Sequence, residues 1–378
     1  IEQLYRNEPE AIQSLLDNLL PLSTEGVNAA YDSLSGVQHT HTQAIVGNLY
    51  RRFQSLLSDR LASGYITSAS HDLSLSLSDE RWARQLGFGL RSRSLLEQGR
   101  SVERGLWLRS FGGVGDIDAT ANASGADYTS AGVAVGVDAQ LNNGVIVGVA
   151  AGYAHTDADT FGGSLDIDSY QVAGYAGWAH NDSYLNGSLG VGVHRSDASR
   201  RVVVGGFTGD AEADYDTLGM TAALEAGHHL YMNNAIRLTP FVGVAYTHLD
   251  RSDFTESGAG SANLTVGQES QELLRSKVGL RFEKTFATPG GVRITPMIET
   301  AYVREHLDSQ NVISAGFANA SDATFRIAGP DLDRNRIQLG ASLGVWFSER
   351  SSLGIGYQAE FADSDDWHSL AATFRMRW

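Results

Sequence analysis

The chain has 378 residues, a formal net charge of −16 at pH 7, 42 Gly, 6 Pro and no Cys. The missing cysteines exclude a disulfide scaffold and any cysteine metal site, and the negative charge argues against nucleic acid as a partner because phosphates would be repelled. No stretch reaches the ~18 apolar residues that a membrane-spanning helix needs, so only a closed β-barrel could carry this sequence across a membrane. The opening residues, IEQLYRNEPE, show no signal peptide, which indicates a processed product or a piece of a longer chain.

The first hundred residues have the apolar spacing of helices. Leucine and isoleucine recur every three or four residues, which predicts helices at 9–22, 24–34 and 38–62, with Gly64 as the C-cap of the last one. Residues 65–104 are ambiguous and rich in arginine. We therefore predict a helical segment, 1–103, that precedes a different domain, 104–378.

From Gly105 onward the apolar period changes to two, the spacing of strands with two unlike faces. Twelve strands are predicted, at 104–116, 126–140, 143–157, 165–180, 182–196, 211–230, 233–249, 269–286, 291–305, 332–348, 351–362 and 367–378. Tight turns such as Asn181-Asp182 and Pro289-Gly290 alternate with long polar loops near 116–126, 157–165, 197–211, 250–268 and 306–331. Short turns at one end and long loops at the other are typical of a transmembrane barrel.

The alternation gives each strand an apolar face and a polar face, as in the last strand, where Leu370 and Phe374 oppose Arg375. A β-sandwich could show the same pattern, but the strands reach the ~9–11 residues of tilted membrane strands, whereas soluble strands usually have ~5–6. Aromatic residues also lie near the strand ends, as in interfacial girdles. We predict an all-β transmembrane barrel of 12 antiparallel strands. Its lumen-facing polar residues are expected to be Arg109, Glu225, Arg275, Arg281, Glu283, Arg293, Glu299, Glu360, Arg375 and Arg377.

Three motifs then show a family resemblance. They are the first-strand sequence LWLRSFGGVGD at 106–116, the helical sequences SLSG (33–36), RRF (51–53) and DRL (59–61), and the C-terminal sequence FRMRW at 374–378. Together they resemble the translocator domain of the classical, type V autotransporters over nearly the whole chain. The matches are not complete: Val37 stands where an acidic residue usually follows the Gly, and Trp378 stands where Phe is more common.

The resemblance implies an outer-membrane barrel of a Gram-negative bacterium that enables export of an N-terminal passenger to the cell surface. The implied partners are that passenger, outer-membrane lipid and lipopolysaccharide, the barrel assembly machinery, which would read Phe374, Met376 and Trp378, and periplasmic chaperones. The translocator is expected to be a monomer without cofactor, metal or enzymatic activity, since any activity would belong to the absent passenger.

The resemblance also implies an α-helical linker partly in the pore, drawn from 38–104. Residues 38–62 form the stronger helix, but their broad apolar stripe suits packing better than a wet pore, whereas 80–104 supply more arginines. Those arginines could pair with Glu225, Glu283, Glu299 and Glu360, or these glutamates could pair with arginines of neighbouring strands. A twelve-stranded lumen has room for about one helix, whose diameter is ~10–12 Å.

Candidate catalytic and metal motifs are weak. Gly340-Ala341-Ser342-Leu343-Gly344 matches G-x-S-x-G but lies inside a strand, where a nucleophile elbow needs a strand, a turn and a helix. Asp331 to Asn335 begin like a calcium loop that lacks its Gly and Glu. His39 with His41, and His228 with His229, lack joint metal-ligand spacing and are expected to be solvated or lumen histidines. Asn28 and Asn48 do not form a self-cleavage pattern.

Two alternatives stay open. One is a porin-like channel, which has no need of a hundred-residue helical leader. The other is a barrel enzyme, for which His155, Asp157 and Asp159 at the extracellular rim are the candidate cluster.

Overall fold

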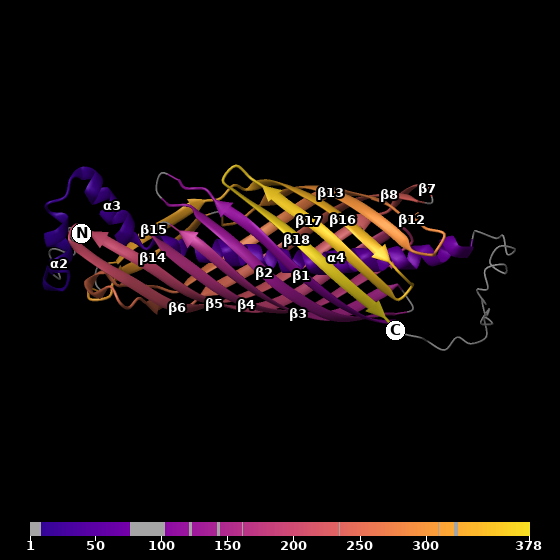
Figure 1. The fold of residues 1–378 in the computed structure, drawn as a ribbon, viewed down its shortest axis with the longest axis horizontal. Helices are drawn as coiled ribbons and strands as arrows, with labels where there is room; N and C mark the ends of the chain where they lie inside the picture. The colour runs from indigo at the N-terminus through magenta and orange to yellow at the C-terminus, as the bar shows by residue number, and fades with distance from the viewer. Residues whose placement is uncertain are drawn as a thin grey trace.

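The computed structural model describes residues 9–75, 103–120, 123–141, 144–160, 162–233, 235–308, 310–320 and 324–378. A closed β-barrel surrounds a helix, and two further helices and a small sheet lie at one end of it (Figure 1). Most of the arginine-rich segment 80–104, one of the two candidates for the pore helix, falls outside the described residues.

Twelve antiparallel strands form the barrel, as the sequence predicts, and β18 pairs with β1 to close it. In chain order they are β1 (Glu103–Ile117), β2 (Ala126–Gln140), β3 (Val145–Thr160), β4 (Gly163–His180), β5 (Ser183–Val204), β6 (Phe207–His228), β8 (Ile236–Arg251), β11 (Glu269–Lys284), β13 (Arg293–Glu305), β16 (Asn335–Trp346), β17 (Ser351–Phe361) and β18 (Asp365–Arg377). The short strands β7 (Leu230–Asn233) and β12 (Phe286–Ala287) follow β6 and β11.

The apolar faces of the strands look outward. Ile355, Leu370 and Val149 are 64%, 66% and 60% exposed, while polar residues of the same strands point inward. An exposed apolar band around a closed barrel is stable only in contact with lipid, which confirms the predicted transmembrane barrel.

Among the described residues before the barrel, the chain forms α2 (Pro9–Leu19), α3 (Thr24–Ser35), the 3₁₀ helix η1 (Val37–Thr40) and α4 (His41–Leu75). Ser23 caps α3 by accepting a hydrogen bond from the Gly26 N–H at 3.2 Å. Gly36 ends α3 in the left-handed conformation, with φ +67°, and lets the chain reverse into η1. The predicted C-cap at Gly64 is wrong, because α4 continues through it. A single glycine costs a helix interior only about 1 kcal/mol, which eleven further helical residues outweigh.

Two of the predicted long loops are strand extensions. β3 and β4 continue to Thr160 and from Gly163, and β5 and β6 meet at a two-residue turn, Gly205-Gly206. The prediction of loops at 157–165 and 197–211 is therefore wrong. The outer faces of these segments are mostly polar and their inner faces mostly apolar. Inner residues such as Val202 stay buried, and that preserves the period of two beyond the membrane.

The other long loops build a second sheet at the same end. It has the order β15–β14–β10–β9, with β9 (Phe254–Thr255) and β10 (Leu264–Val266) from one loop and β14 (Gln310–Phe317) and β15 (Thr324–Asp331) from the other. A 3₁₀ turn, η2 (Gly260–Ala262), connects β9 and β10. We call this four-stranded unit the extracellular sheet.

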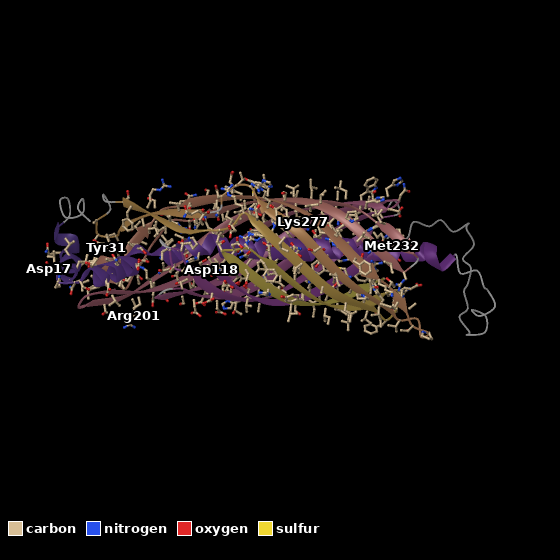
Figure 2. The ribbon with its side chains drawn as sticks, turned by 90° about the horizontal axis from the view of Figure 1, so that it is seen from above. Asp17, Tyr31, Asp118, Arg201, Met232 and Lys277 are labelled. Atoms are coloured by element: carbon tan, nitrogen blue, oxygen red, sulfur yellow. The ribbon has the colours of Figure 1, made fainter. Side chains whose placement is uncertain are left out.

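The two ends of the barrel differ in the way that orients it in a membrane. The helix α3 packs against the tall β5–β6 hairpin, so Asp17, Tyr31 and Arg201 lie at one end and Met232 lies at the other (Figure 2). Long connections lie at the first end, whereas short turns and the C-terminus lie at the second, the layout of extracellular and periplasmic ends. No described helix is both long and apolar enough to cross a membrane by itself.

Candidate functional site: the lumen of the barrel

The helix α4 fills the lumen from His41 to about Ala62. Its side chains Ile45, Tyr50, Leu57 and Leu61 are at most 1% exposed, and it lies against β3, β4, β5, β6 and β8. The apolar stripe of this helix, which suits packing better than contact with water, is therefore the face that packs against the inner wall of the barrel. Of the two candidate segments, 38–62 is therefore the one that the structure describes in the pore. The contact between this helix and the wall is apolar.

Glycines in the wall make room for the aromatic residues of this helix. A Cβ at Gly219 or Gly192 would approach the Tyr50 hydroxyl to 2.5 or 2.7 Å, and a Cβ at Gly152 would approach the Phe53 ring to 2.8 Å. No side chain fits at such distances, so the helix packs against bare backbone. This is one physical reason for the high glycine content of the strands.

The opposite wall is lined by ion pairs. Arg281 lies between Glu225, at 3.0 Å, and Glu299, and Lys277 reaches Glu225 at 2.5 Å. Further pairs on the inner wall are Arg237 with Glu283, Arg275 with Glu360, and Arg336 with Asp365. Buried charges are tolerated only when paired, so these contacts fix the wall rather than leave free charges in the pore.

Three arginines join the helix to the wall. Arg60 binds the carboxylate of Asp138 with two nitrogens, at 2.8 and 2.5 Å, and Arg109 of β1 binds Asp59 of the helix at 2.8 Å. Arg52 lies over the ring of Trp367, 5.0 Å from its centroid. Two of these contacts are at the periplasmic half of the helix, where they hold its end against β1 and β2.

Replacing Arg60 with Met is expected to free this end of the helix, since it leaves Asp138 buried without its arginine. The chain has no cysteine, so Ala62→Cys provides a single reporter thiol. We expect its labelling by a water-soluble maleimide to rise about tenfold in the Arg60→Met background, as the open state becomes more populated. Arg201→Met, which removes an exposed arginine at the other end, is the matched control, and equal rates in both backgrounds would refute the anchor.

The helix does not fill the pore completely. Two cavities of about 150 and 90 Å³ remain beside it, the first bordered by Arg52, Asp59, Arg109 and Arg375, the second by Ser55, Glu225 and Gln358. Polar side chains and volumes above that of one water suit ordered water. The lumen therefore combines apolar contacts between helix and wall with polar cavities whose size suits ordered water.

The structure places the ten residues expected in the lumen on inner-wall positions. Seven have ion-pair partners, namely Arg109, Glu225, Arg275, Arg281, Glu283, Glu299 and Glu360. Arg293 and Arg377 lie over the ring of Trp346, at 5.8 and 5.9 Å from its centroid, and Arg375 borders the larger cavity.

The glutamates pair with arginines and a lysine of the barrel, across neighbouring strands for Glu283 and Glu299 and over intervening strands for Glu225 and Glu360. The alternative, pairing with arginines of 80–104, falls almost entirely outside the described residues. Sequence reasoning missed the Arg60–Asp138 pair, although alternation along β2 puts Asp138 on the same face as Ala134 and Gly136, where a lone carboxylate needs a partner.

The last strand closes the barrel with its apolar face outward. Phe374, Met376 and Trp378 are 40%, 47% and 56% exposed, and the backbone of Trp378 exchanges two hydrogen bonds with Arg104 at 3.0 and 3.2 Å. The C-terminal residue is therefore part of the seam between first and last strands.

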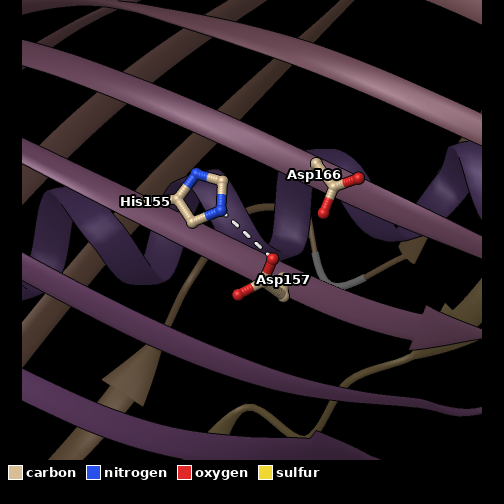
Figure 3. A group of neighbouring side chains, drawn as sticks. All are labelled: His155, Asp157 and Asp166. Atoms are coloured by element: carbon tan, nitrogen blue, oxygen red, sulfur yellow. Dashed lines mark hydrogen bonds and ion pairs between the residues drawn. The ribbon is translucent and has the colours of Figure 1, made fainter.

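The rim cluster expected around His155 forms only in part. The ligand atoms of His155, Asp157 and Asp166 lie within 4.8 Å of one another, while Asp159 is not part of this group (Figure 3). Both ring nitrogens already contact carboxylates, Nε2 to Asp157 at 3.1 Å and Nδ1 to Asp168 at 3.0 Å. The group is exposed on the outer wall, so it forms neither a substrate pocket nor a closed ligand shell.

The remaining motifs have structural roles. Ser342 lies on the inner face of β16, and the Asp331 sequence connects β15 to β16. His228 and His229 point to opposite faces, toward Ser183 and Thr239. His39, expected to be either solvated or in the lumen, is fully buried under the extracellular sheet, where it contacts Glu256.

Comparison with known proteins agrees with this geometry. Residues 106–358, about two thirds of the chain, match the family described as "Autotransporter beta-domain". An extracellular serine protease of Serratia marcescens is 26% identical over 293 residues, which cover 74% of this chain and 26% of that protein. The probable autotransporter YpjA of Escherichia coli K12 is 22% identical over 289 residues, covering 75% and 18%. The chain thus spans about a quarter or less of these relatives.

Solved structures show the same fold. The translocator domain of the autotransporter NalP from Neisseria meningitidis superimposes with a TM-score of 0.65 at 14% identity, covering 90% of this chain and 98% of that one. The β domain of the Bordetella autotransporter BrkA gives 0.55 at 22% identity, covering 72% and 98%. With a family match over more than half of its length and the same barrel around a helix, this chain belongs to the autotransporter β-domain family and is a translocator barrel of the Gram-negative outer membrane.

Proposed function

We propose that this barrel exports a passenger joined to its N-terminus, and that the linker, residues 1–103, remains partly in the pore of the barrel, 104–378, afterwards. The observation that carries this proposal is the direction of α4. It begins at His41, and the helices α2 and α3 that precede it lie at the end with the long connections, on the extracellular side. A passenger attached there would lie outside the cell.

The proposal assigns no chemistry to the barrel. The family's role is transport, and any enzymatic activity would belong to the passenger, as it would in a relative described as a serine protease. Among the described residues, the His155 group lacks a pocket and Ser342 sits in a strand, which supports this division. The porin-like alternative is disfavoured because a packed helix occupies the pore.

The proposed partners follow from the two surfaces of the barrel. The exposed apolar band would contact outer-membrane lipid and lipopolysaccharide, and the closed seam leaves no barrel edge for another subunit, which supports a monomer. Periplasmic chaperones and the barrel assembly machinery would act before closure. Phe374, Met376 and Trp378 would serve as the assembly signal, since they stay accessible on the outer face of the last strand.

Surface display tests the export proposal. A signal peptide and an epitope are placed before Ile1, and the full chain is expressed in a Gram-negative host. We expect an antibody to bind the epitope on intact cells, and we expect a variant ending at Thr373 to lose this signal because β18 cannot close the barrel. An epitope that stays in the periplasm, while the barrel is folded by its heat-dependent gel shift, would contradict the proposal.

A further inference from the structure

The extracellular sheet has no core of its own. Its inner residues Leu264, Val266 and Ile313 are fully buried, but they belong to one apolar cluster with Leu34 and Val37 of the linker. Small sheets need a packing partner to be stable in water. The cluster also contains wall residues such as Val202 and Ala213, so without the linker the sheet would lose part of the apolar surface that covers it, which favours folding of the two loops around the linker.

A buried ion cluster joins the two parts. The carboxylate of Glu256, 3% exposed, accepts hydrogen bonds from His39 Nε2 at 2.8 Å, from Arg200 Nε at 3.0 Å and from the Leu264 N–H at 2.8 Å. Arg200 also donates to the Ser33 carbonyl at 2.6 Å. One cluster therefore contains the linker, the β5 wall and the β9–β10 loop, and removing His39 or Glu256 leaves a buried polar group of the cluster without one of its partners.

Further hydrogen bonds hold the linker backbone. Asn311 of β14 donates to the Thr40 carbonyl at 2.9 Å, and the Thr42 hydroxyl lies 2.7 Å from the Tyr215 hydroxyl. A Cβ at Gly329 would come within 2.5 Å of the Thr40 hydroxyl oxygen, so β15 lies directly on the chain. The two loops, together with β5 and β6 of the wall, thus contact the same ten residues, 33–42.

We propose that the extracellular sheet is a clasp, unfolded while the passenger passes and closed when residues 33–42 reach the mouth of the pore. The inference rests on the proposed export function. The polar residues of the cluster give the clasp its specificity, because a passing segment without His39 and the Ser33 carbonyl in these positions would leave the Glu256–Arg200 ion pair buried with part of its hydrogen bonding unfilled. Closure holds the linker and covers the extracellular mouth.

The clasp should weaken in acid. Burial lowers the pKa of His39, and the positive charges of Arg200 and Arg251 lower it further. Glu256 raises this pKa but does not outweigh burial. The Tyr215 ring also packs against the imidazole. The open state, in which His39 has its ordinary pKa near 6.5, therefore takes up the proton first, and closure loses stability as the pH falls below about 6.5. Burial would raise the pKa of Glu256, but His39 and Arg200 lower it to about 2, so its contribution persists at pH 5. We expect faster opening at pH 5 than at pH 7, and a flatter profile in His39→Gln.

Trypsin cleavage after Arg326 measures the open state. Arg326 is exposed, but its backbone belongs to β15 and is protected while the sheet is folded. In the purified full chain, we expect Glu256→Gln and His39→Gln each to accelerate this cleavage about tenfold or more, as cleavage follows the population of the open form. The matched control is Glu272→Gln, which changes an exposed carboxylate that accepts a hydrogen bond from Tyr246 on the outer wall. Trypsin should cleave this variant at the wild-type rate.

A second variant tests the dependence on the linker. Deleting residues 9–40 should expose Arg326 to trypsin while the barrel keeps its heat-dependent gel shift. The clasp is overturned if trypsin cleaves Glu256→Gln and His39→Gln no faster than Glu272→Gln. It is also overturned if Arg326 stays protected in a folded deletion variant. If the deletion variant does not fold, the point variants decide. Surface display of the epitope is measured separately, in cells that express the same variants. Loss of display with normal cleavage behaviour would contradict the export proposal alone, and normal display with no effect on cleavage would contradict the clasp alone.

Discussion

Deleting residues 1–102 is expected to raise the conductance of the barrel in planar bilayers about tenfold, because the deletion removes the helix that fills the lumen. A helix with side chains is ~10–12 Å across, which is nearly the whole interior of a barrel of this size. Two cavities beside the helix in the described part of the chain have volumes of about 150 and 90 Å³, too small for free passage of hydrated ions. We therefore expect the intact chain to conduct weakly.

A shorter deletion separates the pore helix from the rest of the linker. Removing residues 9–36 takes away α2 and α3 but leaves α4 with its anchors to Asp138 and Arg109. This control should conduct like the intact chain. Equal conductance of the intact chain and the 1–102 deletion would show that α4 does not obstruct the pore, and it would favour the porin-like alternative.

Replacing Arg281 with Met is expected to cost the barrel about 3 kcal/mol of unfolding free energy, the usual penalty for breaking a buried ion pair from one side. Arg281 is 5% exposed and contacts two carboxylates, those of Glu225 and Glu299. Lys277 and Gln338 stay in place, but they cannot satisfy both. Urea unfolding in detergent, followed by the heat-dependent gel shift, measures the change.

Two comparisons make this result specific. Arg304→Met removes an arginine that hydrogen bonds Asn335 on the outer face and should change the unfolding free energy by less than about 0.5 kcal/mol. Adding Glu225→Gln to Arg281→Met should restore part of the loss, because the two sites are in contact and their effects do not add. A loss equal to that of Arg304→Met would mean that water solvates these carboxylates.

The sequence alone determined the number of strands, their outward apolar faces and the closure of the barrel, because each depends on a local pattern. Along the last strand, for example, apolar residues such as Leu370 alternate with polar residues such as Arg375, as expected for a strand between lipid and a polar interior. The three motifs that resemble autotransporters are also local, and the family match extends over the barrel they suggested. The helices were predicted for the same reason, since apolar spacing along 38–62 is visible without a partner.

Only the tertiary structure decided which segment enters the pore and what holds it there. The apolar stripe of α4 does not predict that its packing partner is a wall containing glycines. Nor does the sequence predict that Arg60 pairs with Asp138, 78 positions away. The polar segments 157–165 and 197–211 read as loops because their inner residues are few, yet packing against neighbouring strands and linker keeps them extended. Glu256, His39 and Arg200 are distant in sequence and look like ordinary charged residues there. They form one buried cluster only after the chain has folded, because folding brings their side chains into contact.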